Sequence, residues 1–306
     1  MLRTPILAAA RNDHVKRVVA GAPVSRNVVA RFVAGERTED AVEVSRQLTG
    51  DGLLVSLDHL GEDTTDTTTA AAVVTAYREV LAALSSAGLA SGTEVSMKLS
   101  ALGLGLDVSI AYEHARQVCA AAREAGTTVT VDMEDHTTTD VTLELVERLR
   151  VDFPDVGAVL QSYLRRTEDD CRALATAGSR VRLCKGAYAE PESVAFRTRT
   201  AVDESFRRCL GVLMNGQGYP MVATHDPALV AEALRLAGEV GRDQSSYELQ
   251  MLYGIRPKEQ LRLAAEGEQV RVYVPYGTEW YGYLMRRLAE RPANLTFFLR
   301  ALASRS

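Results

Sequence analysis

The feature of the sequence that most constrains the fold is a regular alternation of short β-rich apolar runs with longer helical segments. The runs cover residues 53–57, 94–99, 128–132, 158–161, 181–184, 221–224, 248–252 and 270–274. The helical segments lie between them, at 70–85, 108–125, 140–150, 168–177, 191–215, 227–240 and 257–266. Strands that alternate with helices form parallel βαβ units, and continuous apolar strands are typical of burial on both faces. The eight units predict an α/β fold of the (β/α)8 TIM barrel class.

Residues 1–50 depart from this alternation and contain helical segments at 5–19, 25–33 and 38–48. A chain of 306 residues can still form one catalytic domain, since α/β barrels of this length commonly do. An open doubly wound sheet is the alternative, but no GxGxxG motif follows the first predicted strand. We therefore predict N-terminal helices at 1–50 that pack on a barrel at 51–306.

Composition excludes several classes of partner. The net charge is −5 and no block of basic residues occurs, so we expect no nucleic acid. The four cysteines, Cys119, Cys171, Cys184 and Cys209, show neither CxxC spacing nor nearby paired histidines, so we expect no metal and no disulfide framework. Without a signal peptide or an apolar run of about 18 residues, the sequence favours the cytoplasm and small-molecule partners.

Polar side chains gather at the carboxyl ends of the predicted strands, where barrel enzymes build their active sites. They are Lys98, Asp132, Gln161, Arg182, Lys185, Thr224, His225 and Tyr273. Lysine is rare in this chain, yet Lys98 and Lys185 interrupt apolar runs. Because lysine is seldom buried without a partner, both are candidates for a functional site, although lysines extending from strand ends to solvent are an alternative.

Charged residues on three strands predict an anion site. Asp132 ends an apolar run and needs a cation or donors to stay ionised, and Lys98, one strand away, is the expected partner. A purely structural ion pair is the alternative. Arg182 and Lys185 concentrate positive charge at the fifth strand, where Gly186 allows close approach of the backbone. A phosphate, a flavin ring that becomes anionic on reduction, or a substrate carboxylate would fit this charge.

Three further strand-end residues are less specific. Gln161 presents donor and acceptor edges to an amide-like ring such as isoalloxazine, although a buried Gln more often satisfies backbone groups. His225 is a lone histidine, which is more often structural than catalytic, so we do not predict a general base there. We expect Cys184 to point into the barrel wall as a small apolar residue.

The segment after the last strand carries two adjacent arginines on a predicted helix. Tyr283, Arg286, Arg287 and Glu290 would share one face of this helix. Paired guanidinium groups suit bidentate binding of a carboxylate or phosphate, and the neighbouring apolar stripe of Leu284 and Leu288 would dock the helix. A solvated helix face with an Arg–Glu pair is the alternative.

Taken in order, these segments resemble the proline dehydrogenase (proline oxidase) family. The matching motifs run from about residue 95 to 294 and read SMKLSALG, VDMED, LQSYLRR, VRLCKGAY, ATHD, ELQMLYGI and RVYVPYGTEWYGYLMRRLAERPAN. The resemblance implies a distorted (β/α)8 TIM barrel with an N-terminal helical extension that binds FAD noncovalently. It also implies oxidation of L-proline to Δ1-pyrroline-5-carboxylate, the first step of proline catabolism to glutamate, by hydride transfer from proline C5 to FAD N5. The short chain resembles the monofunctional bacterial form.

The resemblance also assigns roles to residues and partners. Arg286 and Arg287 would bind the proline carboxylate with Lys98, while Glu290 holds the arginines in place. Asp132 would organise a pocket lined by Tyr273, Tyr283 and Leu252, and Arg182 would lie near flavin N5. The other implied FAD contacts are Met133, Gln161, Lys185, Gly186, Ala187, Thr224 and His225. Electrons would pass to a quinone through peripheral contact with the inner face of the cell membrane.

Two other functions stay open on sequence grounds. A barrel aldolase would use Lys185 to form a Schiff base, since a desolvated lysine at a strand end is a suitable nucleophile. A noncatalytic amino-acid binding barrel would bind proline without FAD. The oligomeric state and the identity of the quinone do not follow from the sequence.

Overall fold

The described strands close into one parallel barrel in the order β1 to β8. Residues 29–290 are described in a computed structural model of the protein, with side chains described up to Met285. The strands are β1 (Leu54–His59), β2 (Thr93–Met97), β3 (Val129–Val131), β4 (Gly157–Gln161), β5 (Arg180–Cys184), β6 (Tyr219–Ala223), β7 (Glu248–Leu252) and β8 (Val270–Tyr276). Parallel pairing of β1 with β8 closes the barrel, so the predicted fold class is confirmed.

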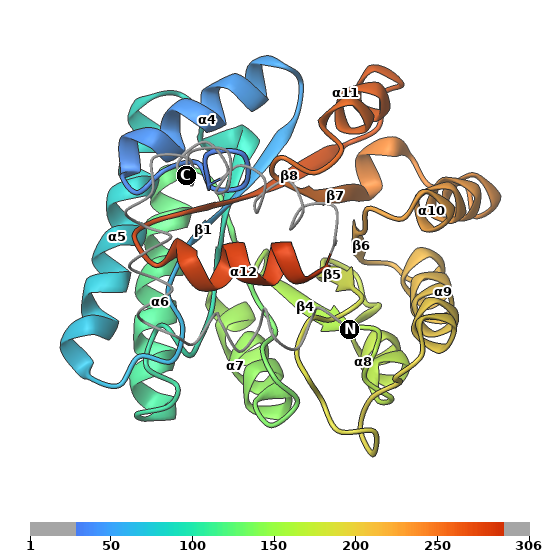
Figure 1. The fold of residues 1–306 in the computed structure, drawn as a ribbon, viewed down its shortest axis with the longest axis horizontal. Coiled ribbons are helices and arrows are strands. Elements are labelled where there is room, and N and C mark those ends of the chain that lie inside the picture. Colours follow the sequence, from blue (N-terminus) through green and yellow to red (C-terminus); the bar gives the residue numbers. More distant parts are fainter. Residues whose placement is uncertain (1–28, 291–306) are drawn as a thin grey trace, which may run out of the picture.

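Helices surround this barrel on the outside (Figure 1). They are α5 (Thr67–Ser86), α6 (Val108–Ala125), α7 (Thr139–Asp152), α8 (Thr167–Leu174), α9 (Arg199–Asn215), α10 (Pro227–Glu239) and α11 (Pro257–Ala265), with short 3-10 turns at Ala90–Gly92 and Gln244–Ser246. Aspartates begin several of them, because a carboxylate accepts hydrogen bonds from the first free backbone N–H groups. Asp66 accepts from Thr69 N, and Asp107 from Ser109 N and Ile110 N.

Strand residues alternate between an apolar layer under the helices and a polar barrel interior. On β1, Val55 and Leu57 are fully buried in the hydrophobic core. The alternate residues face inwards, where Ser56 accepts a hydrogen bond from Arg182 of β5 and Asp58 binds Lys98. The apolar layer holds the helices to the barrel, and the polar interior provides the groups for a site at its mouth.

The last described helix departs from the regular barrel pattern. Figure 1 shows α12 (Trp280–Glu290) crossing in front of the strands instead of standing beside them. The outer position between β8 and β1 belongs to α4 (Thr38–Gly50), which contacts both strands and α5. Leu284 of α12 is completely buried, which confirms the predicted docking of this helix, whereas the side chain of Leu288 lies outside the described residues. The barrel is therefore distorted, and α12 lies at the end where β8 finishes.

The chain just before α4 is bonded to the start of α12. Ala34 N donates to Pro275 O at 2.9 Å, and Gly277 N donates to Gly35 O at 2.9 Å. Trp280 Nε1 donates to a Glu36 carboxylate oxygen at 3.0 Å. The N-terminal segment thus helps to fix α12 across the barrel. The predicted helix at 5–19 and most of the one at 25–33 lie outside the described residues, and the division of the chain at residue 50 stays a prediction.

Replacing Trp280 with phenylalanine should loosen α12, because it removes this donor and keeps an aromatic ring. One such bond contributes about 1 kcal/mol, so backbone amides of α12 should exchange with deuterium about fivefold faster. Amides of the barrel strands should keep their exchange rates. Glu39→Ala, which changes an exposed acid of α4, is the control. Unchanged exchange in α12 would show that the bond does not hold the helix.

Several predicted boundaries were wrong, and two of the differences have a clear physical reason. The helix predicted at 191–215 begins only at Arg199, because the preceding residues are bonded to the loop after β4. Phe196 N donates to Tyr163 O at 2.7 Å, and Arg165 N donates to Val194 O at 2.9 Å. The last strand continues to Tyr276 and not to residue 274, since its pairing with β1 extends past Pro275.

Candidate active site

Lys98, just beyond β2, forms an ion pair with Asp58 of β1. Its Nζ lies 2.8 Å from both carboxylate oxygens, and the two side chains are only 10% and 2% exposed. Burial alone would lower the pKa of Lys98, but the Asp58 carboxylate, with a smaller contribution from Asp132, raises it above its ordinary value. The predicted direct pair of Lys98 with Asp132 is therefore wrong, because the carboxylate on the adjacent strand β1 takes the ammonium group.

Asp132, just after β3, joins three other strands. Its Oδ1 accepts hydrogen bonds from Arg182 Nη1 at 2.7 Å and Ser96 Oγ at 2.8 Å. Its Oδ2 accepts from the hydroxyl of Tyr273 at 2.7 Å. The Arg182 guanidinium also lies 5.3 Å from the centre of the Tyr273 ring. Asp132 therefore fixes the relative positions of the arginine and the tyrosine.

Arg182 lies inside the barrel and has a protein acceptor for every N–H group. Its Nε donates to Gln250 at 2.6 Å, and its Nη1 donates to Ser96 and Asp132. Its Nη2 donates to Ser56 at 3.2 Å and to Glu94 at 3.0 Å. A guanidinium group has five N–H donors, and these bonds use all of them. Arg182 can thus act on a bound group through its fixed charge without a spare hydrogen bond.

The ion-paired cations and carboxylates that face the interior of the barrel around Arg182 are equal in number. Among the described side chains the cations are Lys98, Arg180, Arg182 and Arg271, and the carboxylates are Asp58, Glu94, Asp132 and Glu248. An anionic substrate would therefore need further cations. Helix α12 crosses the barrel here and carries Arg286 and Arg287, whose side chains, like that of Glu290, lie outside the described residues.

The residues predicted to bind a cofactor follow or belong to β3, β4, β5 and β6. Gln161 Nε2 donates to the backbone oxygen of Glu134 at 2.7 Å. This bond does not use the side-chain amide oxygen of Gln161. Thr224 Oγ1 accepts from Asp226 N at 3.1 Å. His225 Nε2 accepts from Leu252 N at 2.8 Å, so this nitrogen carries no proton, as expected for a structural histidine. Met133 is buried beside Asp132.

Lys185 and Gly186 have local partners in the loop after β5. Lys185 Nζ lies 2.5 Å from a carboxylate oxygen of Asp203 and 3.3 Å from one of Asp226. Gly186 has φ +101°, and a Cβ there would lie 2.3 Å from the Tyr163 ring. The glycine is therefore required by a neighbouring tyrosine. The next residue, Ala187, is exposed.

Cys184 does not point into the barrel wall, so that prediction was wrong. Arg180 and Arg182 face inwards, and strand alternation places Cys184 on the same inner side, where it is half-buried. Burial raises the pKa of its thiol to about 11, so the thiol stays protonated near neutral pH.

Sequence reasoning missed several members of this network. They are Ser56, Asp58, Glu94, Ser96, Glu248 and Gln250. The available signal was polar residues at every second position of otherwise apolar strands, as in Glu94, Ser96 and Lys98. That pattern indicates a barrel with a polar interior.

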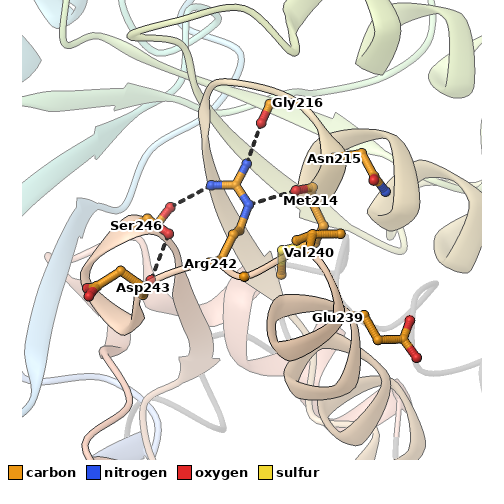
Figure 2. Close-up of a pocket in the computed structure, with 9 residues that line it drawn as sticks. Met214, Asn215, Gly216, Glu239, Val240, Arg242, Asp243 and Ser246 are labelled. Carbon is orange, nitrogen blue, oxygen red and sulfur yellow. Dashed lines mark hydrogen bonds between the residues drawn. The ribbon is translucent and has the colours of Figure 1, made fainter.

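A separate pocket lies between the carboxyl ends of α9 and α10, lined by Met214, Gly216, Val240 and Arg242 among others (Figure 2). Arg242 donates to the backbone oxygens of Leu213, Met214, Gly216, Gly218 and Ser246. The bonds to Leu213, Met214 and Gly216 satisfy carbonyls left free where α9 ends. The arginine is therefore a structural cap, and the pocket contains none of the predicted site residues.

Comparison with known proteins assigns the chain to a family. The family model described as proline dehydrogenase matches residues 41–300. The chain belongs to the proline dehydrogenase family. It is 37% identical over 302 residues to proline dehydrogenase 1 of Bacillus subtilis, an alignment that covers 99% of each chain. It is 41% identical to the proline dehydrogenase of Deinococcus radiodurans, with 90% of each chain covered.

A solved structure supports the barrel of this proline dehydrogenase family member. Proline utilization A from Bdellovibrio bacteriovorus, inactivated by N-propargylglycine, superimposes with a TM-score of 0.80. Its sequence identity is 23%, and the match covers 92% of this chain and 34% of that one. At this identity the likeness concerns the fold alone.

The described part of the chain contains neither a membrane-spanning helix nor a cluster of metal-binding side chains. No helix within residues 29–290 is both long and apolar enough to cross a bilayer. Those residues also contain no cluster of His, Cys, Asp and Glu side chains that would hold a metal ion.

Proposed function

We propose that this protein is an FAD-dependent proline dehydrogenase. It oxidises L-proline to Δ1-pyrroline-5-carboxylate by hydride transfer from proline C5 to FAD N5, the first step towards glutamate. Membership of the family supports oxidation of proline. The observation that carries the flavin proposal is the hydrogen bond of 2.7 Å from Arg182 of β5 to Asp132, just after β3. It joins a residue predicted to contact the cofactor to one predicted to organise the substrate pocket.

The arrangement of these residues divides the mouth of the barrel into two parts. Lys98, Asp132 and Tyr273 follow or belong to β2, β3 and β8, which supports a substrate site on that side. Gln161, Lys185 and Thr224 come from the ends of β4, β5 and β6, which supports a cofactor site on the other side. Arg182 reaches from the second part into the first, where its charge can influence both ligands.

The donors and charges of the second part fit a flavin. FAD would be held by Met133, Gln161, Arg182, Lys185, Gly186, Ala187, Thr224 and His225, and when bound it supplies the hydride acceptor. Arg182 would place a fixed positive charge where negative charge develops on reduction. Gln161 has a free amide oxygen for the polar edge of a ring, and Lys185 gives partly exposed positive charge for a phosphate.

Residues of the first part would bind and orient proline. Arg286 and Arg287 hold its carboxylate together with Lys98, and Glu290 holds the two arginines in place. Tyr273, Tyr283 and Leu252 pack against the ring, so that C5 is held in one orientation. Asp132 keeps Tyr273 and Arg182 in place. The carboxylates of Asp58 and Asp132 are already bonded to cations, so the amine proton of proline leaves to solvent.

Electrons from the reduced enzyme go to a quinone, with peripheral contact at the inner face of the cell membrane. This acceptor is proposed from the family resemblance. Reduction of a soluble quinone analogue by the proline-reduced protein, followed by absorbance, tests it. No transfer to any quinone would contradict it.

The absorption spectrum of the purified protein tests the flavin directly. We expect a band at about 450 nm from FAD that is released on denaturation, and anaerobic L-proline should bleach this band. A Schiff-base aldolase would instead lack the band and be trapped by borohydride at Lys185. The two ion pairs of Lys185 argue against that role, because a Schiff-base lysine reacts as a free amine. Proline binding without FAD would indicate a noncatalytic barrel.

A further inference from the structure

A second layer of buried charge lies in the barrel beneath Arg182. It contains Glu94 of β2, Arg180 of β5, Glu248 of β7 and Arg271 of β8. Glu94 and Glu248 are at most 1% exposed. Buried carboxylates of this kind stay charged only with close cationic partners. The layer therefore places full charges below the groups that line the mouth.

Glu94 is the carboxylate of this layer that binds Arg182. One of its oxygens accepts from Arg182 Nη2 at 3.0 Å, and the other accepts from Arg180 Nη2 at 2.8 Å. Arg271 Nε lies 3.9 Å from the first oxygen. Burial opposes ionisation, but Arg271, Arg180 and Arg182 together lower the pKa of Glu94 to about 2. Glu94 is therefore negative throughout the neutral range.

Glu248 provides a natural comparison in the same layer. It binds Arg271 Nε at 2.7 Å and Nη2 at 2.9 Å, and it accepts from the Tyr219 hydroxyl at 3.1 Å. It reaches Arg182 only indirectly, through the amide of Gln250. The two carboxylates are thus alike in charge and burial but differ in direct contact with Arg182.

We propose that Glu94 is a positioning residue that, through Arg182, sets the electron affinity of the bound flavin. The inference rests on the proposed function. Since all five N–H donors of Arg182 are bound to protein, its influence on a group in the mouth depends on its charge and on the carboxylates that offset it. Glu94 lowers the positive potential that Arg182 presents, and so disfavours the more negative, reduced flavin.

The test is the midpoint potential of FAD bound to the intact Glu94→Gln variant. Loss of one nearby negative charge should favour the reduced flavin by about tenfold, a rise of about 30 mV for a two-electron couple. FAD content should stay at the wild-type level. Glu248→Gln is the matched control, and its shift should be clearly smaller. An unchanged potential in Glu94→Gln, or equal shifts in both variants, would overturn the role of Glu94.

A second variant keeps the test decisive if Glu94→Gln does not fold. Arg180→Gln removes the cation that shares Glu94, while Arg182 and Arg271 still stabilise the carboxylate. More of the Glu94 charge then acts on Arg182, so the midpoint potential should fall, and a rise or no change would contradict the proposal. Wild-type protein without a flavin that proline reduces would instead contradict the proposed function itself.

Discussion

Replacing Arg287 with methionine should raise the KM for L-proline about a hundredfold, because it removes one of the two arginines that, with Lys98, are proposed to bind the substrate carboxylate. A bidentate, charge-assisted hydrogen bond contributes up to about 3 kcal/mol, which corresponds to a factor of this size. The described cations of the mouth already have carboxylate partners, so they cannot replace the lost arginine. Arg286→Met should act in the same direction. Steady-state kinetics with varied proline measure the effect.

Controls separate substrate binding from damage to the protein. FAD content of both variants, measured from absorbance after denaturation, should match the wild type. Arg262→Met removes an arginine of α11 that is paired with Glu259 and Glu266 on the surface, and it should leave KM unchanged. An unchanged KM in Arg286→Met and Arg287→Met would mean that the arginines of α12 form a solvated surface and not a carboxylate site.

Replacing Asp58 with asparagine should lower kcat/KM for proline at least about tenfold and make the loss grow as pH rises. Asp58 is the partner that raises the pKa of Lys98 against its burial. Without this carboxylate the pKa of the buried lysine falls, so the lysine loses its proton at a lower pH than in the wild type, and with it the charge that attracts the substrate. A charged hydrogen bond contributes about 1.5–3 kcal/mol, which sets the size of the effect.

The pH profile is best measured as the ratio of variant to wild type, since the ionisation of the proline amine then cancels. Lys98→Met should show a large loss that does not vary with pH in this ratio. In the Lys98→Met background, Asp58→Asn should cause little further loss, because the two residues act as one unit. A pH-independent ratio for Asp58→Asn, or additive losses in the double variant, would contradict the role of Asp58.

The alternation of strands and helices predicted the barrel because each strand is apolar enough to be recognised locally. The α6 helix lies at the predicted 108–125, where it begins after the Asp107 cap and stops before Gly126, whose φ is +82°. The late start of α9 depends on hydrogen bonds between 163–165 and 194–196, which join segments far apart in the sequence. The crossing of the barrel by α12 depends likewise on α4 taking the place between β8 and β1.

The sequence was sufficient to locate residues of the candidate site, but not to predict which of them bond to one another. Residues such as Lys98, Asp132, Arg182 and Tyr273 were found because they are polar at the ends of apolar strands. Their partners follow from the register and curvature of the closed barrel, which brings Arg182 within 3.0 Å of Glu94 although they are far apart in the chain. Asp58 was missed because the first strand was predicted to end at residue 57, one residue too early to include it.

The most direct test of the central claim compares anaerobic reduction of the protein by L-proline with reduction by L-proline deuterated at C5. Hydride transfer from C5 to FAD predicts that L-proline bleaches the band at about 450 nm in a single turnover and forms Δ1-pyrroline-5-carboxylate. It also predicts that bleaching is slower with the deuterated substrate, because the C5–H bond breaks in that step. A flavin-loaded protein that proline does not bleach, or that bleaches with a different product, would contradict the proposed function.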